Sequence, residues 1–492
     1  MNLDSTNPAD AVPRGAAQTS APKRPVSALR KNLRICTGEG ILATPWSFLV
    51  LPSNFLWVAL LIKFYHIEKG VYGIIASLPA CSSFVQIILL SVVAKFMTAR
   101  DLSLAMSWLN LGLWMMMASL LAYFPQEDAH RLGNIFIIFF AFNNLSHSFL
   151  SIGWQAWIQE YIPLRIRGTY FGRRNFLNAL TTLSFLLFCN LVLWILGERI
   201  LAYQICLGVP LVLRFFSNLW QHSIVNPKAP YQRLIRTGWW EDLFELRGYR
   251  PLMLFILFAA WTGFWMNLVG PFVPVFIYQE LGWESKQFNV LIILATIFGA
   301  LGQPLWGRLI DRHGCVAVIL ISLGLWETCA NVFWVIMRKE IAWVLYPMYC
   351  IGGFASMGYF LGLFNMVMKL IPAHLKTAGG SFHLAATSLA AAVAPVIAGK
   401  MLQHAGDEGH SLLPIYHWIF GMKEVAIYAG MALLLLIKEP ATSGGLSELS
   451  GTMRTIRQIM MVGPLALFAN LSPMGLRKRK DRPVKTKKTP HA

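Results

Sequence analysis

Twelve long apolar runs dominate this chain of 492 residues and restrict what it can fold into. Nine runs contain no Asp, Glu, Lys or Arg, and the other three contain only Arg214, Glu327 and the pair Lys423/Glu424. About 20 apolar residues in a helix match a bilayer, and lipid forces each backbone group to be paired within its own segment. The pattern predicts an all-α integral membrane protein with twelve transmembrane helices, near residues 41–62, 71–94, 102–123, 133–157, 175–197, 200–220, 252–278, 288–307, 315–337, 342–368, 379–399 and 415–437.

Buried helices of a large soluble enzyme are the alternative explanation of these runs. Charged residues make up 13% of the chain, whereas soluble domains contain about a quarter. The low charge therefore favours the membrane protein.

Lys and Arg are distributed unevenly between the two sides predicted for the membrane. With the N-terminus inside, the inner segments hold 32 of them and the outer segments hold 8. Cytoplasmic segments of membrane proteins carry such an excess, so both termini are predicted to be cytoplasmic. A net charge of +19 can also indicate nucleic-acid binding, but topology accounts for it, and we expect no nucleic-acid partner.

The longest internal break separates the runs into six and six and contains five Lys or Arg residues. It predicts two six-helix bundles joined by a cytoplasmic loop. The first residues are rich in Pro, Ala, Ser and Thr and are predicted to be disordered. The expected parts are a basic tail at 1–38, an N-terminal bundle at 39–221, the central loop at 222–250, a C-terminal bundle at 251–438 and a cytoplasmic tail at 439–492.

A further apolar stretch at 458–476 raises the question of a thirteenth span. Gly463, Pro464 and Pro473 weaken that interpretation. Another crossing would also place "RKRK" at 477–480 outside, against the charge rule. We expect a short helix that lies in the inner interface, followed by a basic end.

The two halves of the sequence resemble each other. "IPLRIRGTYFGRRNFL" begins at Ile162 after the fourth run, and "IPAHLKTAGGSFHLAA" begins at Ile371 after the tenth. "GRLIDRHG" at 307–314 follows the eighth run, and its degenerate counterpart "AKFMTARD" at 94–101 follows the second. The correspondence predicts a duplicated six-helix unit, a known plan of transporters.

The chain thus resembles the major facilitator superfamily of transporters over residues 39–438. The resemblance rests on the six-and-six arrangement, the basic central loop and the turn "GRLIDRHG" between the eighth and ninth runs. The residue after the turn departs from the family pattern, because it is Cys315 where a basic residue is usual. The family turn runs Gly-x-Leu-x-Asp-Arg-x-Gly, and it is matched by Gly307, Leu309, Asp311, Arg312 and Gly314.

The resemblance implies a secondary transporter that works by alternating access and is not an enzyme. Two bundles would rock about a central site and move a small organic solute, such as a sugar-like one, across the inner (plasma) membrane. The alternative is a non-transporting membrane sensor or lipid-handling scaffold that keeps the fold, which a saturable flux would exclude. The sugar-porter signature after the sixth helix and the helix 5 motif of drug antiporters are both missing from the sequence.

The turn at 307–314 is predicted to be a gating turn. Gly307 and Gly314 permit a tight reversal, and Asp311 is expected near the N-terminus of the ninth helix, where the helix dipole favours a negative charge. The resemblance implies that Arg308 and Arg312 help to latch the inner face in the outward-open state. The alternative is that these arginines only determine topology.

The basic turn "RIRGTYFGRR" at 165–174 is a second candidate for gating. Its residues Arg167 and Arg174 could pair across the halves or contact anionic lipid headgroups. The same charges are also explained by topology alone.

The resemblance implies that helices 1, 4, 7 and 10 line the central cavity. Polar and aromatic residues recur on these helices, and on helix 4 they repeat along one face. Packing between helices is the alternative role for each of them. His147 is the one that could titrate near neutral pH. The candidates are Asn54, Trp57, Asn143, His147, Ser151, Trp154, Trp261, Trp265, Asn267, Tyr359 and Asn365.

Ionisable residues within the runs are candidates for coupling to a proton or a sodium ion. Glu327 is the deepest carboxylate by sequence, and Glu39 lies at the inner start of helix 1, where we expect it to reach water. Arg214 is expected to snorkel toward the inner surface, and Lys423 with Glu424 to mark the outer boundary of helix 12. We expect a monomer in the lipid bilayer, without cofactor or metal.

Overall fold

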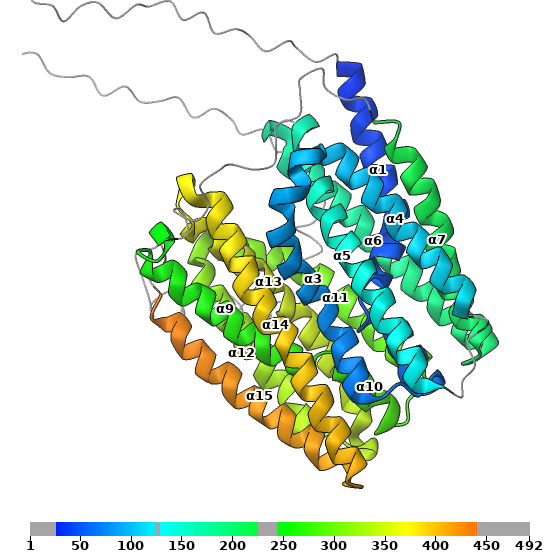
Figure 1. Ribbon diagram of the computed structural model, residues 1–492. Helices are drawn as coiled ribbons and strands as arrows, with labels where there is room; N and C mark the ends of the chain where they lie inside the picture. Colours follow the sequence, from blue (N-terminus) through cyan, green and yellow to red (C-terminus); the bar gives the residue numbers. More distant parts are fainter. Residues whose placement is uncertain are drawn as a thin grey trace, which may run out of the picture.

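The protein is helical throughout the part of the chain that its computed structural model describes. These residues are 26–121, 123, 128–162, 164–224, 244–437 and 439, and they contain no strand. Figure 1 shows the helices gathered in two groups that lie side by side. The groups correspond to the N-terminal and C-terminal halves of the chain.

The N-terminal half supplies the helices drawn in blue to green in Figure 1. In chain order they are α1 (Val26–Leu49), α2 (Phe55–Val58), the π-helix η1 (Ala59–Phe64), α3 (Lys69–Phe96), α4 (Ala99–Leu121), α5 (Ala129–Tyr161), α6 (Leu164–Leu196) and α7 (Ile200–Gln221).

The C-terminal half repeats this arrangement with more interruptions. Its elements are α9 (Arg250–Val269), α10 (Phe272–Gln279), α11 (Ser285–His313), α12 (Cys315–Cys329), the 3-10 helices η2 (Asn331–Ile336) and η3 (Lys339–Val344), α13 (Leu345–Leu370), η4 (Ala373–Leu375), α14 (Lys376–Asp407) and α15 (Leu412–Leu435).

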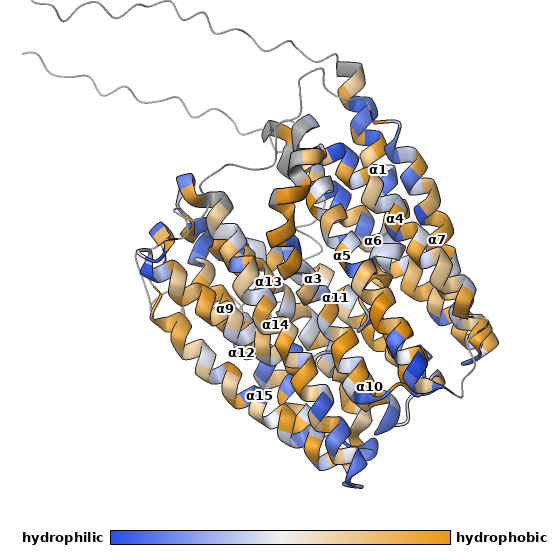
Figure 2. Cartoon of the chain, viewed as in Figure 1, coloured by the Kyte–Doolittle hydropathy of each residue, from blue (hydrophilic) through white to orange (hydrophobic). Residues whose placement is uncertain are grey.

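Eleven helical segments among the described residues are long and apolar enough to cross a membrane. Hydrophobic residues cover the middle of the helices, and hydrophilic residues gather at their ends (Figure 2). This distribution is expected where lipid surrounds the middle of each helix and water its ends. The chain is therefore a multi-pass membrane protein.

The first apolar run is broken, contrary to the prediction of a continuous helix. α1 ends at Leu49, and α2 with η1 forms only a short apolar helix over Phe55–Phe64. Pro52 lies in the break, where it removes a backbone donor and disfavours helical backbone in the residue before it. Asn54 then starts α2, because its side chain accepts the N–H of Leu56 at 2.7 Å.

α1 begins at Val26, inside the segment predicted to be a disordered tail. Its first turns carry Arg30, Lys31 and Arg34, so this part of the helix does not form an apolar run. Ile35 and Cys36 are nevertheless buried on one side. The extension is thus an amphipathic helix with one face against the N-terminal bundle.

The two halves meet mainly through α3 against α14 and α6 against α11. The α3–α14 contact is a close approach of two backbones. A Cβ atom at Gly399 would lie 2.6 Å from the carbonyl oxygen of Lys69 and 3.0 Å from the Cα atom of Gly73. Small residues at such a crossing let membrane helices pack closely.

Hydrogen bonds join the halves at the end of the molecule where α3 begins, which we call the closed end. Gln403 donates to Glu68 at 2.8 Å and accepts the N–H of Gly70 at 3.1 Å. The hydroxyl of Tyr72 donates to the carbonyl of Pro271 at 2.9 Å. Side chains from both halves therefore hold the closed end together.

Glu198 forms the charged part of the closed end. One carboxylate oxygen accepts a hydrogen bond from Lys63, and the other accepts the backbone N–H of Ser285 at the start of α11. Burial alone would raise the pKa of Glu198, but the bonds from Lys63 and Ser285 outweigh it and lower the pKa below its ordinary value of 4.5. The carboxylate thus links the N-terminal half to α11 in its ionised form.

Gly399→Ala is expected to destabilise the protein, because its Cβ would meet the backbone of α3. Overpacking of this kind costs about 1–3 kcal/mol, which should lower the melting temperature of the purified protein. Gly406→Ala on the same helix is the matched control, since a Cβ there meets no atom within 4 Å. Equal melting temperatures for the two variants would contradict the close approach.

Glu198→Gln is expected to destabilise the protein at neutral pH by about 1 kcal/mol. A depressed pKa means that the carboxylate contributes stability above its unfolded pKa, about 4.3, and loses it as the pH falls through the lower folded value. The difference in melting temperature between wild type and variant should therefore disappear in acid. A difference that is constant with pH would refute this role.

Candidate functional site

The N-terminal half contains a cavity of about 440 Å³ among α1, α5, α6 and α7. Its lining combines charged, amide and aromatic side chains, which is unusual for the interior of a membrane helix bundle. The lining includes the charged, histidine and tryptophan residues Glu39, Trp46, His147, Trp154, Arg174 and Arg214.

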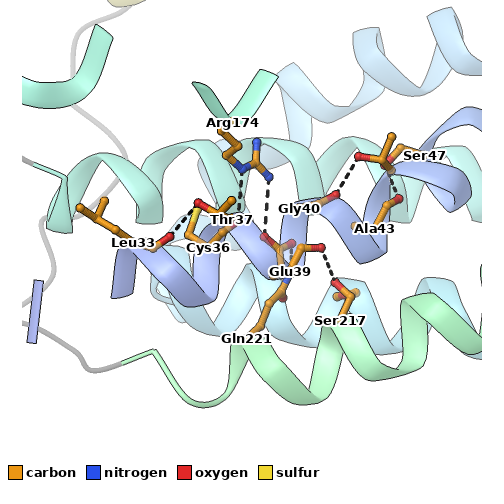
Figure 3. A network of polar contacts seen from close by, with 12 residues as sticks. Leu33, Cys36, Thr37, Glu39, Gly40, Ala43, Ser47, Arg174, Ser217 and Gln221 are labelled. Carbon is orange, nitrogen blue, oxygen red and sulfur yellow. Dashed lines mark hydrogen bonds and ion pairs between the residues drawn. The ribbon is translucent and has the colours of Figure 1, made fainter. Parts of the chain in front are cut away.

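Glu39 lies at the centre of the polar contacts beside this cavity (Figure 3). Its carboxylate accepts a hydrogen bond from Gln221 at 2.5 Å. It also lies 3.7 Å from the guanidinium of Arg174 and 3.9 Å from that of Arg214. The prediction that Glu39 reaches water is wrong, because its side chain is 4% exposed and the two arginines compensate its charge.

Both arginines also lie over tryptophan rings. Arg174 is 4.6 Å from the ring centre of Trp154, and Arg214 is 4.5 Å from that of Trp46. Cation–π contacts of this kind strengthen where water is excluded.

Arg214 does not snorkel as predicted. It is 3% exposed and donates to the hydroxyl of Ser107 on α4 at 2.6 Å. Polar partners on α1 and α4 hold its charge inside the bundle, so it has no need to reach the surface.

Several buried polar atoms at the cavity have no hydrogen-bond partner among the described residues. Some can donate and others can accept. A cavity with both kinds can satisfy hydroxyl groups, which donate and accept, while the Trp rings cover an apolar face. The atoms are Nε1 of Trp46, Nδ1 of His147, Nε of Arg214, Oε2 of Glu39, Oδ1 of Asn178 and Oε1 of Gln221.

Most residues of the stripe predicted on helix 4, which is α5 in the structure, line the cavity. His147, Ser151 and Trp154 line it, and the ring of His147 lies 5.3 Å from that of Trp46. Asn143 does not line it. Its carbonyl and its side-chain oxygen accept hydrogen bonds from Asn110 at 2.9 and 2.8 Å, so it joins α5 to α4.

The two residues predicted to line the cavity from helix 1 have structural roles instead. Asn54 is the N-cap of α2. Trp57 is fully buried and packs 5.3 Å from Trp114 and 5.2 Å from Phe140, measured between ring centres. Neither residue lines the cavity, because the break after Leu49 changes the face that this segment presents.

A cavity of about 330 Å³ in the C-terminal half is lined by two of the residues predicted on helices 7 and 10. These are Asn267 and Tyr359, accompanied by His383 of α14 and by Ala80 of α3 from the other half. The hydroxyl of Tyr359 lies 2.8 Å from that of Thr262. This cavity therefore lies where the two halves adjoin.

The other predicted residues of helices 7 and 10 contact a neighbouring helix or their own helix. Trp261 donates to the carbonyl of Ala426 on α15 at 2.7 Å, and Trp265 packs against Phe264 with 5.4 Å between ring centres. Asn365 donates to the carbonyl of Leu361 on its own helix at 2.8 Å.

Glu327 and the pair Lys423/Glu424, which lie far apart in the sequence, meet inside the C-terminal half. Lys423 of α15 contacts Glu327 of α12 and lies 3.0 Å from Glu424. Lys423 and Glu424 are 5% and 6% exposed. Both residues lie in the middle of α15 and not at the predicted boundary of helix 12, and the ammonium group of Lys423 compensates a buried carboxylate.

The local structure of the gating turn differs from the prediction. Asp311 lies in the last turn of α11, not at the N-terminus of α12, and Gly307 lies within α11 without a tight neighbour. The reversal occurs at Gly314 alone, whose φ is 86°. Arg308, Asp311 and Arg312 are exposed and make no ion pair with another described residue, so their role as a latch stays a prediction.

Glu439 takes the place predicted for Asp311 at the start of α12. Its carboxylate accepts the N–H groups of Cys315 at 2.7 Å and Val316 at 3.1 Å, and pairs with Lys369. The side chain of Arg167 and the stretch 458–476 lie outside the described residues, and Arg174 contacts its own half.

Sequence reasoning missed Trp46 and Asn178, and it misjudged Arg214, Lys423 and Glu424. A signal was present for the last three, because with Glu327 they are the charged residues of the apolar runs, and such residues are retained where they have partners or a function. Trp46 and Asn178 had no such signal, since Trp and Asn occur widely in membrane helices.

Comparison with known proteins supports the resemblance seen in the sequence. The family model described as Major Facilitator Superfamily matches residues 252–476. A search of curated proteins found no match. The resemblance to this superfamily is thereby confirmed.

Solved structures of transporters share the fold at low sequence identity. A mutant of the nucleoside transporter NupG is 14% identical, with a TM-score of 0.63 over 82% of this chain and 99% of its own. A D-xylose–proton symporter is 12% identical, with a TM-score of 0.60 over 84% and 98%. A bacterial homologue of the iron transporter ferroportin, in an inward-facing state, is 11% identical, with a TM-score of 0.62 over 84% and 98%.

Arg214→Met is expected to lower the melting temperature strongly, because it leaves the buried Glu39 with Arg174 as its single charge partner among the described residues. Breaking a buried ion pair costs about 3–5 kcal/mol. Adding Glu39→Gln to this variant should restore part of the loss, since Gln221 can still donate to the amide oxygen. Additive losses in the double variant would show that the two residues do not interact.

Proposed function

We propose that the protein is a secondary transporter. It has the fold of the major facilitator superfamily, and its C-terminal half matches the family model. It moves a small organic solute by alternating access of the two bundles. Three structural neighbours of different cargo, a nucleoside, a sugar and iron, share the fold. The fold therefore does not specify the solute, and the side chains of this protein's own cavity must indicate it.

The proposed topology has twelve spans with both termini in the cytoplasm. Eleven spans satisfy length and apolarity, and α1 with the short helix Phe55–Phe64 supplies the twelfth. The excess of Lys and Arg on one side supports this orientation. The protein then lies in the inner (plasma) membrane as a monomer surrounded by lipid.

In this topology the closed end faces outward, and the conformation is inward-facing. Glu198, Gln403 and Tyr72 are the contacts that seal the outer side. The gating turn at 307–314 lies at the opposite, inner end. Its exposed charges are free to form the proposed latch when the inner side closes.

The solute proposed here is neutral and hydroxylated, such as a sugar. The observation that carries this is the set of donors and acceptors, beside Trp46 and Trp154 in the N-terminal cavity, that lack a hydrogen-bond partner among the described residues. Hydroxyl groups satisfy both kinds of atom, and a sugar ring has an apolar face that packs on an aromatic ring. Asn267, Tyr359 and His383 would contact the solute from the other half.

Ligand binding tests the solute class. Pentoses, hexoses and nucleosides should raise the melting temperature of the purified protein, because a ligand stabilises the state that it binds. Trp154→Ala should weaken that binding by about 10-fold, equivalent to about 1.4 kcal/mol. Trp194→Ala is the matched control, since this tryptophan lies on the next helix, α6, away from the cavity, with 71% of its surface exposed. Stabilisation by carboxylates or amines alone would refute the sugar-like solute.

Uptake into proteoliposomes tests the transport role. Saturable uptake of the stabilising solute should occur in wild type and in Trp194→Ala, and should need a higher solute concentration in Trp154→Ala. A protein that binds a solute but shows no flux or counterflow would instead be the non-transporting sensor or scaffold.

A further inference from the structure

The C-terminal bundle holds a buried cluster of charge away from the contact between the halves. Glu327 is fully buried, and Lys423 and Glu424 are nine-tenths buried. The ammonium group of Lys423 contacts Glu327 and lies 3.0 Å from Glu424, between the two carboxylates. Asn331 donates a further hydrogen bond to Glu327 at 3.0 Å. We call the charged residues Glu327, Lys423 and Glu424 the triad.

The triad is not balanced in charge. Two carboxylates face one ammonium group, so the fully ionised triad carries one excess negative charge. A buried net charge is costly unless it is paired. Oε1 of Glu327 and Oε2 of Glu424 are buried and have no hydrogen-bond partner among the described residues.

The surrounding elements supply no described cation for this excess charge. Apart from Arg250 at its start, α9 has no Asp, Glu, Lys, Arg or His, and α10 has none. His417 of α15 is directed to the carbonyl of Met337, at 2.8 Å. Lys369 in the last turn of α13 pairs with Glu439, and the remaining titratable side chains of α12, α13 and α15 are cysteines and tyrosines.

A proton suits this site better than a metal ion. The ammonium group already occupies the position between the carboxylates, and a metal cation there would displace or repel it. A proton needs only one free carboxylate oxygen, and two are available. The protonated triad is neutral, which suits its buried surroundings.

The triad adjoins a cavity of about 330 Å³ that is lined by Lys423, Glu424 and Asn331. Met266 lines both this cavity and the one that contains Asn267 and Tyr359. Trp326, also on the triad's cavity, lies 6.1 Å from the ring of Tyr359. One layer of side chains therefore separates the triad from the region where the halves adjoin.

We propose that Glu327, Lys423 and Glu424 form a proton-binding site that couples transport to proton movement. One proton from water adds to a free oxygen of Glu327 or Glu424, and an O–H bond is the only bond that forms. Coupling rests on the function proposed above, whereas proton binding does not. Coupling would pass through Trp326, Met266 and Tyr359, which connect the triad's cavity with the cavity where the halves adjoin.

Proton uptake by the purified protein tests the site without a substrate. On acidification from about pH 8 to about pH 5.5, above the ordinary pKa of glutamate of ~4.3, wild type should take up about one proton more per molecule than Glu424→Gln. Glu327→Gln should show the same loss. Glu340→Gln, which removes an exposed carboxyl, should match wild type.

Equal uptake by wild type and Glu424→Gln would overturn the site, whether or not the protein transports a solute. If Glu327→Gln fails to fold, Glu424→Gln still decides the question, because Lys423 keeps its contact with Glu327 in that variant. In proteoliposomes, Glu424→Gln should abolish solute accumulation driven by a pH gradient but keep counterflow. Unchanged gradient-driven accumulation would overturn the coupling and leave the proton site.

Discussion

Lipid offers no hydrogen-bond partner, and every polar group in the middle of this protein must therefore find one inside the protein. The backbone meets this demand by forming helices. The few charged side chains within the apolar runs meet it by pairing with each other: Arg214 with Glu39, and Lys423 with Glu327. Because these partners lie on different helices, each pair also fixes how its bundle is assembled.

The cations of the two buried pairs occupy related places in the two halves, whereas their carboxylate partners do not. Arg214 and Lys423 are 209 positions apart, the same offset that aligns Ile162 with Ile371. The surroundings have diverged, since the N-terminal pair has a second arginine, Arg174, and the C-terminal pair a second carboxylate, Glu424. The buried cluster of the N-terminal half thus carries excess positive charge, and that of the C-terminal half carries excess negative charge.

The contact between the halves uses a different physical solution. Gly73 and Gly399 let α3 and α14 approach until their backbones touch, while polar side chains such as Glu198 and Gln403 hold the closed end. The backbone contact between the two glycines depends little on the angle between the helices. The hydrogen bonds of the closed end, in contrast, can break together. Such an interface can rock about the glycine contact when the polar end opens.

The sequence by itself determined the membrane-spanning helices, the six-and-six division and the superfamily resemblance, because apolar length, Lys/Arg bias and a repeated turn are properties of the chain taken locally. It also placed His147, Ser151 and Trp154 on one face, since helical spacing suffices for that. Only the tertiary structure decided which polar residues face a cavity and which face a neighbouring helix, as for Asn143 and Trp57. It alone brought Glu327 to Lys423, because a buried charge takes its partner from whichever helix packs beside it, and sequence spacing does not specify that helix.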